Sequence, residues 1–292
     1  MQDAAQTQLA QALGFQPGMV LRTFGMRRSG NHAITNWLTR NREKNSVFLN
    51  NCVIGKPAAT SCRGIEVNTR RLPHKQGDSL VDTTFAAGDG ALVVISYEDF
   101  APDTDDLVAG LTSDIPEEMI TRNIVMFRNF MNWSASLLHK VQSNDAQQPL
   151  DCLRIMMSAM DKYRDLLDLV ANAKSVGALP VNYDRWVARP RYRGRLLQEL
   201  GLPRNDNTLG PVQPYGGGSS FQRDAQKAEE LATDQRWREM INDPSFQIVL
   251  LAASQDPELI ALMHKLMPQD AEMLTTYLGQ AQFPYHVQVT DT

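Results

Sequence analysis

The chain has 292 residues, of which 29 are basic and 33 acidic, so its formal net charge is −4. Hydrophobic residues make up 42% and charged residues 21%, which is typical of globular proteins and excludes a collagen-like rod, a coiled coil or a wholly disordered chain. The slight acidic excess argues against nucleic acid as a partner that the whole surface binds, although it is compatible with a local basic pocket.

Three cysteines, Cys52, Cys62 and Cys152, cannot all pair within one chain, and no two have C-x-x-C spacing. We expect unpaired thiols in a reducing compartment rather than a disulfide framework or a structural zinc site. The N-terminus lacks the basic and apolar regions of a signal peptide, and the longest apolar run, 248–253, is far shorter than the roughly 20 residues that span a bilayer. The sequence therefore predicts a cytoplasmic protein without a membrane span.

Five short apolar runs are typical of buried parallel strands, and they cover residues 19–24, 47–49, 91–97, 123–127 and 178–181. Apolar spacings of three and four predict helices containing 33–38, 133–141, 153–170 and 192–200, and the C-terminal region also reads as helices. Residues 50–90 give no clear pattern. Strands that alternate with helices predict an α/β fold, with a short central parallel sheet flanked by helices. We expect a helix and turn over 1–18, an α/β domain over 19–225, and a helical extension over 226–292 packed on the same domain.

The loop after the first strand runs from Gly25 to Gly30 and has the glycine spacing of a Walker A loop. The Lys and Ser or Thr that a nucleoside triphosphatase needs are replaced by Asn31 and His32. A loop between a strand and a helix still directs backbone N–H groups and a helix N-terminus at an anion. Arginines 27 and 28 add charge there, and Arg can bind a phosphate through two hydrogen bonds. The alternative is an ordinary glycine turn with two solvated arginines.

The run Arg28-Ser29-Gly30-Asn31-His32 resembles the 5′-phosphosulfate loop of sulfotransferases that use 3′-phosphoadenosine 5′-phosphosulfate (PAPS). That family has a basic residue, Ser, Gly and two threonines, so Asn31 and His32 depart from its pattern while keeping hydrogen-bond donors. The resemblance implies a P-loop-like sulfotransferase fold with cofactor contacts from residues 27 to 32, namely Arg27, Arg28, Ser29, Gly30, Asn31 and His32. Cytosolic members continue with a Trp that stacks on adenine, where this chain has Ala33.

A second motif follows the fourth predicted strand, where Arg128 precedes Ser136 by eight residues. The same family binds the 3′-phosphate of its cofactor with an Arg and a Ser at this spacing, and Arg supplies a charged fork while Ser supplies a hydroxyl. The order of the two motifs along the chain strengthens the resemblance, because the phosphate loop comes first and the second motif follows about 100 residues later. The alternative is a strand-end Arg in a surface ion pair and a helical Ser without a ligand.

Two weaker matches lie further along the chain. Tyr183 follows the fifth predicted strand, where the resemblance implies a position near adenine. The glycine-rich run 216–221 occupies the place of the family's late cofactor loop, so the resemblance implies contacts from Gly217, Gly218 and Ser219. The family's Arg-Lys-Gly triplet is missing there, and Arg223 is a possible substitute. A flexible linker is the alternative interpretation of the three glycines.

Sulfuryl transfer needs a base for the acceptor proton, a positive group for the charge on the leaving phosphate, and no metal. Arg28, assisted by His32, is the candidate for the leaving group. The resemblance implies a His or Glu base before the second motif. Glu98, at the end of the third predicted strand, is our candidate. Alternatives are its neighbour Asp99, His74 in a basic loop, and His32 itself.

These features predict a PAPS-dependent sulfotransferase that acts on the hydroxyl or amine of a small molecule or glycan and releases 3′,5′-ADP (PAP). Two other functions stay open: a P-loop kinase or other phosphotransferase, and a non-catalytic nucleotide-binding protein with the same fold. The absence of a Gly-Lys-Ser/Thr ending argues against the kinase. Neither the acceptor nor the oligomeric state can be read from the sequence.

Overall fold

A seven-stranded sheet forms the centre of the computed structural model, which describes residues 9–103, 111, 115–213, 221–222, 224 and 226–280. The strand order is β4-β3-β2-β5-β1-β6-β7. Strands β2, β5, β1, β6 and β7 run parallel, and β3 and β4 pair antiparallel at one edge. The strands are β1 (Met19–Gly25), β2 (Ser46–Asn50), β3 (Gly64–Val67), β4 (Arg70–Leu72), β5 (Leu92–Glu98), β6 (Arg122–Phe127) and β7 (Ala178–Asn182).

The predicted α/β fold is confirmed, and all five predicted strands are the parallel ones. The sheet is wider than predicted because residues 50–90 add the β3–β4 hairpin. Neither strand of this hairpin stands out in the sequence, because the four residues of β3 are all buried and include Glu66, and β4 has only three residues. The hairpin turns at Asn68 and Thr69, which both adopt positive φ (52° and 67°) without glycine.

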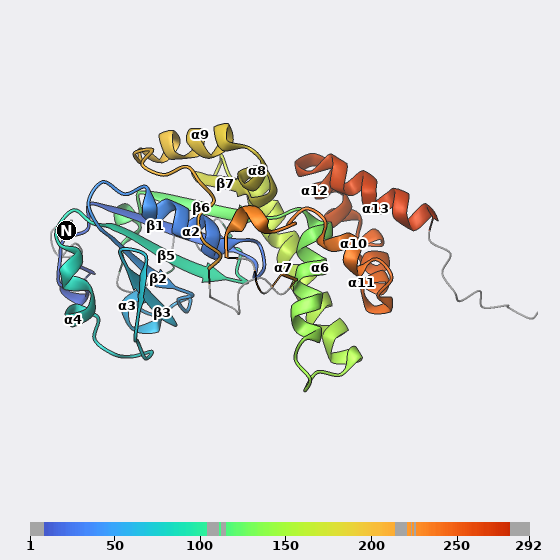
Figure 1. Ribbon diagram of the computed structural model, residues 1–292, viewed down its shortest axis with the longest axis horizontal. Helices are drawn as coiled ribbons and strands as arrows, with labels where there is room; N and C mark the ends of the chain where they lie inside the picture. Colours follow the sequence, from blue (N-terminus) through green and yellow to red (C-terminus); the bar gives the residue numbers. More distant parts are fainter. Residues whose placement is uncertain are drawn as a thin grey trace, which may run out of the picture.

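Helices cover both faces of the sheet (Figure 1). Leu21 of β1 belongs to a core formed with α2, α8 and α9, whereas its neighbour Val20 belongs to a core formed with α6, α7 and the C-terminal helices. Successive strand residues point to opposite faces, so each of the five parallel strands supplies both cores. The principal helices are α2 (Asn31–Arg40), α3 (Ala58–Ser61), α4 (Val81–Thr84), α6 (Phe130–Gln142), α7 (Pro149–Ala171), α8 (Tyr183–Ala188), α9 (Pro190–Leu200), α10 (Arg236–Met240), α11 (Pro244–Ser254), α12 (Pro257–Leu266) and α13 (Pro268–Gln280).

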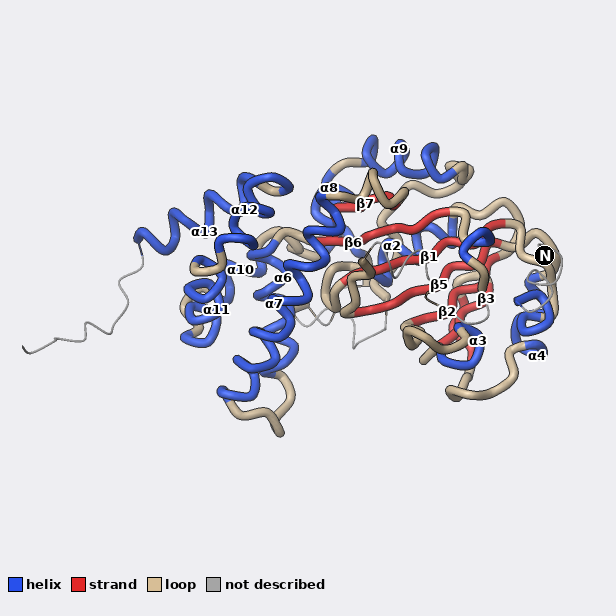
Figure 2. Tube along the Cα trace, turned by 180° about the vertical axis from the view of Figure 1, so that it is seen from behind, coloured by secondary structure: helices blue, strands red, loops and turns tan. Residues whose placement is uncertain are grey.

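The C-terminal helical region packs against α6 and α7 at the end of the molecule away from β3 and β4 (Figures 1 and 2). Helix α12 begins at Asp256-Pro257, where the Asp256 carboxylate accepts a hydrogen bond from the Leu259 N–H at 3.0 Å and proline opens the helix. Asp243 caps α11 in the same way. These local signals fix where the helices begin, and their packing brings α10 and α13 to α6.

Strand β1 is the topological switch point of the parallel strands. The chain passes from β1 to β2 and β5 on one side, then to β6 and β7 on the other. Ligands of open α/β sheets bind outside the carboxyl ends of the strands at such a point. The residues that follow these ends include Met26, Asn51, Asp99, Arg128 and Tyr183, so the sequence-predicted motifs meet at one edge of the sheet.

All three cysteines are buried and none forms a disulfide. Among the described helices, none alone is long and apolar enough to cross a bilayer. Helices α11 and α12 meet these criteria only when taken together, and the pair is bent by 89°.

Candidate functional site

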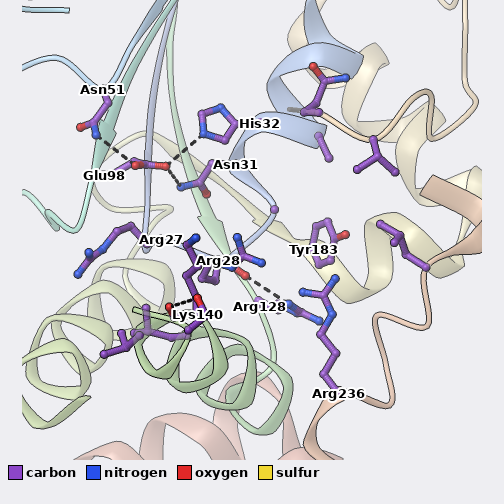
Figure 3. Close-up of a pocket in the computed structure, with 18 of the residues that line it drawn as sticks. Arg27, Arg28, Asn31, His32, Asn51, Glu98, Arg128, Lys140, Tyr183 and Arg236 are labelled. Atoms are coloured by element: carbon purple, nitrogen blue, oxygen red, sulfur yellow. Dashed lines mark hydrogen bonds and ion pairs between the residues drawn. The ribbon is translucent and has the colours of Figure 1, made fainter. Parts of the chain in front are cut away.

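A cavity of 780 Å³ lies at the carboxyl ends of the parallel strands (Figure 3). This volume is in the range of small-molecule sites. Its walls come from the loop after β1, the ends of β2 and β5, helices α6 and α8, and the segments on either side of residue 220. Arg28, Arg128 and Arg236 lie near Tyr183 at one end, and Glu98 lies with Asn31, His32 and Asn51 at the other (Figure 3).

The loop between β1 and α2 has an unusual backbone. Arg28 adopts a positive φ of 68°, and Gly30, the N-cap of α2, has a φ of 84°. A Cβ on Gly30 would overlap the ring of Tyr183, so glycine is needed for space as well as for conformation. The indole Nε1 of Trp133 in α6 donates to the Arg27 carbonyl at 3.0 Å and holds the loop from the other side.

This loop has the features of an anion site. The first turn of α2 contains no acidic residue, so its partial positive charge is not offset within the helix. The hydroxyl of Ser29 is fully buried and, within the described part of the chain, has no hydrogen-bond partner. An unsatisfied buried hydroxyl is costly, and a ligand oxygen would satisfy it.

The Asn31 side chain is directed at the protein itself. Its amide donates to the Met26 carbonyl at 3.1 Å, to the Gly25 carbonyl at 3.4 Å and to Glu98 Oε1 at 3.4 Å. Asn31 therefore braces the loop and links it to the end of β5. Its backbone N–H, at the first position of α2, remains a group that can face an anion.

Two arginines donate to one hydroxyl, and a third arginine donates to the backbone of one of them. Ser136 of α6 is fully buried, and its Oγ accepts hydrogen bonds from Arg236 Nη1 at 2.8 Å and from Arg28 Nε at 3.4 Å. Arg128, which is only 1% exposed, donates through Nη1 to the Arg28 carbonyl at 3.3 Å. Arg128 is thus buried in the site rather than part of a surface ion pair.

The charges in this cluster repel one another. Burial, and next the charge of Arg128, lower the pKa of Arg28 and lower that of Arg236 to about 9. Since the positive neighbours disfavour the charged forms, the cluster carries an excess of positive charge. An anion with more than one negative charge would relieve this repulsion.

Arg128 is held by groups from three parts of the chain. Its Nη2 donates to the Thr233 carbonyl, its Nε lies 3.8 Å from Asp184 Oδ1, and its guanidinium lies 5.2 Å from the centre of the Tyr183 ring. Asp184 also accepts from the Asn129 N–H at 2.7 Å, and burial raises the pKa of its carboxyl. These contacts fix the guanidinium at the floor of the cavity.

Glu98 is the centre of the other end. Its Oε1 lies 3.4 Å from the Asn31 amide and 3.6 Å from His32 Nε2, and its Oε2 accepts from Asn51 Nδ2 at 3.2 Å. Burial raises the pKa of Glu98, with a further contribution from Asp99. A carboxylate with a raised pKa is a stronger base than usual, which is the property that a general base near neutral pH requires.

His32 has the opposite shift. Burial, then the charges of Arg28 and Arg71, lower its pKa to about 4. The imidazole is therefore neutral near pH 7, and its contact with Glu98 is not an ion pair at that pH. A neutral ring can donate from one nitrogen and accept at the other.

The remaining sequence candidates lie in different surroundings. Arg27 forms an ion pair with Asp99, whose Oδ1 also accepts from the Arg27 N–H at 2.9 Å. His74 lies outside the cavity lining, where its Nε2 is 3.4 Å from Cys62 Sγ. Gly217, Gly218, Ser219 and Arg223 lie outside the described residues.

Two residues of the site were not found from the sequence. Arg236 belongs to no recognisable motif, and its proximity to Ser136 depends on tertiary packing. Asn51 had a weak signal, because it is a polar residue directly after a buried strand, which in an open α/β sheet faces the ligand edge.

No protein-family model and no curated protein matches this sequence. Among solved structures, the chain is similar to the mouse sulfotransferase SULT7A1 in complex with PAP. The match has a TM-score of 0.37 and 10% sequence identity, and it covers 97% of this chain and 91% of that chain.

Proposed function

We propose that the protein is a sulfotransferase that transfers the sulfuryl group of PAPS to an acceptor hydroxyl or amine and releases PAP. The donor supplies an activated sulfur–oxygen bond. In the balanced reaction a bond forms from the acceptor atom to sulfur, the bond from sulfur to the phosphate oxygen breaks, and the acceptor proton passes to the protein. The two ends of the cavity provide groups for these needs.

The observation that carries the proposal is the buried cluster of Arg28, Arg128 and Arg236. Arg28 and Arg236 both donate to Ser136, and Arg128 donates to the Arg28 carbonyl. A 3′-phosphate carries up to two negative charges and several acceptor oxygens, and buried arginines bind such groups through paired hydrogen bonds. Repulsion within the cluster means that the anion would be bound where positive charge is already in excess. A ligand with one phosphate group fewer would lose this contribution.

The loop before α2 would hold the 5′-phosphosulfate. The helix N-terminus, the backbone N–H groups and the Ser29 hydroxyl are the groups that would contact its oxygens. Arg28 belongs to both this loop and the arginine cluster, so its charge is suited to stabilising the negative charge that develops on the leaving phosphate.

Apolar residues line the cavity beside the cluster and would hold the adenine: Ala33, Tyr183, Val212, Ala228 and Leu231. Tyr183 is fixed from behind by Trp186, with ring centres 5.9 Å apart and an interplanar angle of 22°. Its ring is therefore a candidate for the stacking contact with adenine, which Ala33 cannot make.

Glu98 would act as the general base. Its raised pKa, its three side-chain partners and its position on the cavity wall support this role. His32 is neutral and 3.6 Å away, so it would orient Glu98 or donate to the substrate rather than carry charge. Asp99 is a weaker candidate because it is paired with Arg27.

The phosphotransferase alternative receives less support. Asn31 takes the position of the Walker lysine, and its amide is used by the loop carbonyls and by Glu98. A side chain held in this way is not available to the terminal phosphates of ATP.

The proposal is tested by calorimetric binding of PAP and of 5′-AMP, which lacks the 3′-phosphate, to the wild type, Ser136→Ala and Arg128→Ala. Ser134→Ala is the matched control: this serine is also buried in α6, but its hydroxyl bonds to the Phe130 carbonyl at 2.7 Å. ATP with and without magnesium serves as the competing ligand.

We expect the wild type and Ser134→Ala to bind PAP at least ~10-fold more tightly than 5′-AMP, because a hydrogen bond to a charged group contributes about 1.5–3 kcal/mol. Arg128→Ala should remove this preference and Ser136→Ala should reduce it. Magnesium-dependent binding of ATP, with no preference for PAP, would favour the phosphotransferase. Binding of PAP without sulfuryl transfer to any acceptor would favour a non-catalytic protein.

A further inference from the structure

The cavity extends beyond the residues assigned to the nucleotide. On the strand side its lining includes Asn51, which lies beside Glu98 in Figure 3, and Arg63. The end of α6 and the following loop contribute Lys140, Asn144 and Gln147. These side chains are amides and cations. Leu137, Val141 and Ile155 add aliphatic surface on the α6 and α7 side, so this part of the wall combines cations and amides with aliphatic side chains.

Positive charge surrounds the candidate base. Arg27 and Arg63 line the cavity together with Glu98, and their charges favour its ionised form. Lys140 adds a third cation to the cavity lining. Among the described residues that line the cavity, Glu98 is the carboxylate, and it is surrounded by hydrogen-bond donors.

A second cavity continues this charge along α7. It has a volume of 320 Å³, shares Arg27 and Ile155 with the first, and is also lined by Arg154 and Lys162. Its carboxylate in the described lining is Asp99, which is paired with Arg27. Arg154 also contacts Asp151 of its own helix at 3.4 Å, but both side chains are well exposed and such a pair is weak.

We propose that the acceptor is a hydroxyl group of an acidic oligosaccharide. This proposal rests on the sulfotransferase function and names its substrate class. Amides such as Asn51, Asn144 and Gln147 both donate and accept, as a polyhydroxylated ligand requires. The cations along the two cavities match carboxylate or sulfate groups at intervals along a chain. The aliphatic side chains Leu137, Val141 and Ile155 would instead favour a phenol or a tyrosine side chain, so both serve as competing acceptors in the test.

In the reaction the acceptor hydroxyl oxygen forms the bond to sulfur, and its proton goes to the Glu98 carboxylate. The bond from sulfur to the bridging oxygen breaks, and PAP leaves with that electron pair. Arg63 and Lys140 take no part in these steps. Their role would be to hold the anionic groups of neighbouring sugar units, so their loss should raise KM much more than it lowers kcat.

The experiment uses the full chain, PAPS labelled with sulfur-35, and four acceptors. These are an oligosaccharide of alternating hexuronic acid and N-acetylhexosamine, the same oligosaccharide with its carboxyls reduced to alcohols, 4-nitrophenol, and an acidic tyrosine peptide. Binding of each acceptor in the presence of PAP is measured separately by calorimetry. Arg63→Ala and Lys140→Ala are compared with the control Lys174→Ala. Lys174 is exposed and precedes the amino end of β7, whereas the cavity lies at the carboxyl ends of the strands.

We expect the acidic oligosaccharide to bind and to be labelled, with kcat/KM at least ~10-fold above that of its reduced form. Arg63→Ala and Lys140→Ala should each raise its KM several-fold while PAP affinity and Lys174→Ala stay at wild-type values. Equal use of the reduced oligosaccharide, preference for 4-nitrophenol or the peptide, or failure of the acidic oligosaccharide to bind would overturn the acceptor proposal. If PAP itself does not bind, the sulfotransferase proposal fails first, so the two failures are distinguishable.

Discussion

Arg236 donates a hydrogen bond of 2.8 Å to Ser136, although 100 positions separate them in the chain. Ser136 belongs to α6, the helix that follows β6, and Arg236 belongs to α10 in the C-terminal helical region. The arginine cluster is therefore shared between the sheet edge and the C-terminal helices, and its geometry depends on how they pack.

Arg236→Gln should weaken PAP binding without weakening the fold. Burial and the charge of Arg128 lower the pKa of Arg236 to about 9, which means that the charged guanidinium is destabilised in the ligand-free protein. Replacing it with a neutral side chain removes this destabilisation. We expect an unchanged or higher Tm without ligand and a loss of PAP affinity of roughly 10- to 100-fold. Arg238→Gln, an exposed arginine on the same helix, should alter neither quantity.

Glu98 and His32 make opposite predictions for the pH profile of kcat/KM. The raised pKa of Glu98 predicts an acidic limb above the ordinary carboxyl value of about 4.3, because activity requires the ionised base. Glu98→Gln should abolish this limb and reduce kcat by ~100-fold or more while PAP still binds. His32→Gln should keep the limb, because the imidazole is already neutral above its pKa of about 4.

Asp99→Asn is the control for that experiment, because it changes the neighbouring carboxyl and its ion pair with Arg27. It should retain the limb. An acidic limb that disappears in Asp99→Asn or His32→Gln but persists in Glu98→Gln would show that Glu98 is not the general base.

His32 also predicts how stability depends on pH. The pKa is about 4 in the folded state and 6.5 ordinarily, so between these values the unfolded chain binds more protons. This contribution to stability is complete above pH 6.5 and is lost as the pH falls towards 4. In urea titrations, the wild type should lose roughly 3 kcal/mol relative to His32→Gln across that window. Parallel curves for the two proteins would contradict the assignment.

Gly30→Ala should be more harmful than Gly201→Ala, although both glycines have positive φ (84° and 68°). A Cβ at Gly201, the C-cap of α9, meets nothing within 4 Å, so that variant pays only the conformational cost of about 1–2 kcal/mol. A Cβ at Gly30 also overlaps the Tyr183 ring. We expect a further loss of about 1–3 kcal/mol in denaturant titrations, together with weaker PAP binding.

Asp270→Asn should remove a pH dependence of the opposite sign. Burial raises the pKa of Asp270 to about 7 from 3.8, so between these values the folded chain binds more protons and stability falls as the pH rises. Asparagine can still accept from the Met131 N–H, now 3.0 Å from the carboxylate. Relative to the variant, the wild type should therefore be less stable at pH 8 than at pH 4.5, as measured by urea denaturation.

The sequence predicted the parallel strands because each is a short apolar run between polar turns. It also predicted Arg28, Ser29 and Gly30 in the strand–loop–helix segment, since those residues are adjacent in the chain and their spacing indicates a phosphate loop. The position of Glu98 followed from its place at a strand end. Local patterns are sufficient for features of this kind.

Other parts of the site depend on contacts that no local pattern encodes. The side-chain amide of Asn31 contacts loop carbonyls that are themselves positioned by the turn, so the direction of this side chain could not be predicted from the motif. Arg236 reaches Ser136 only because α10 packs on α6. The β3–β4 hairpin is equally hidden, because β3 is buried on both faces and loses the alternation that identifies a strand.

The sharing of the arginine cluster between distant segments has a consequence during protein synthesis. A ribosome makes the sheet, the phosphate loop and α6 before it reaches residue 236, so an emerging chain holds Arg28, Arg128 and Ser136 without their third cation. Asp270, which caps α6 beside this cluster, emerges later still. Under the proposed function, nucleotide should therefore bind less tightly to a chain whose C-terminal helices have not yet emerged, because Arg236 is missing from the cluster.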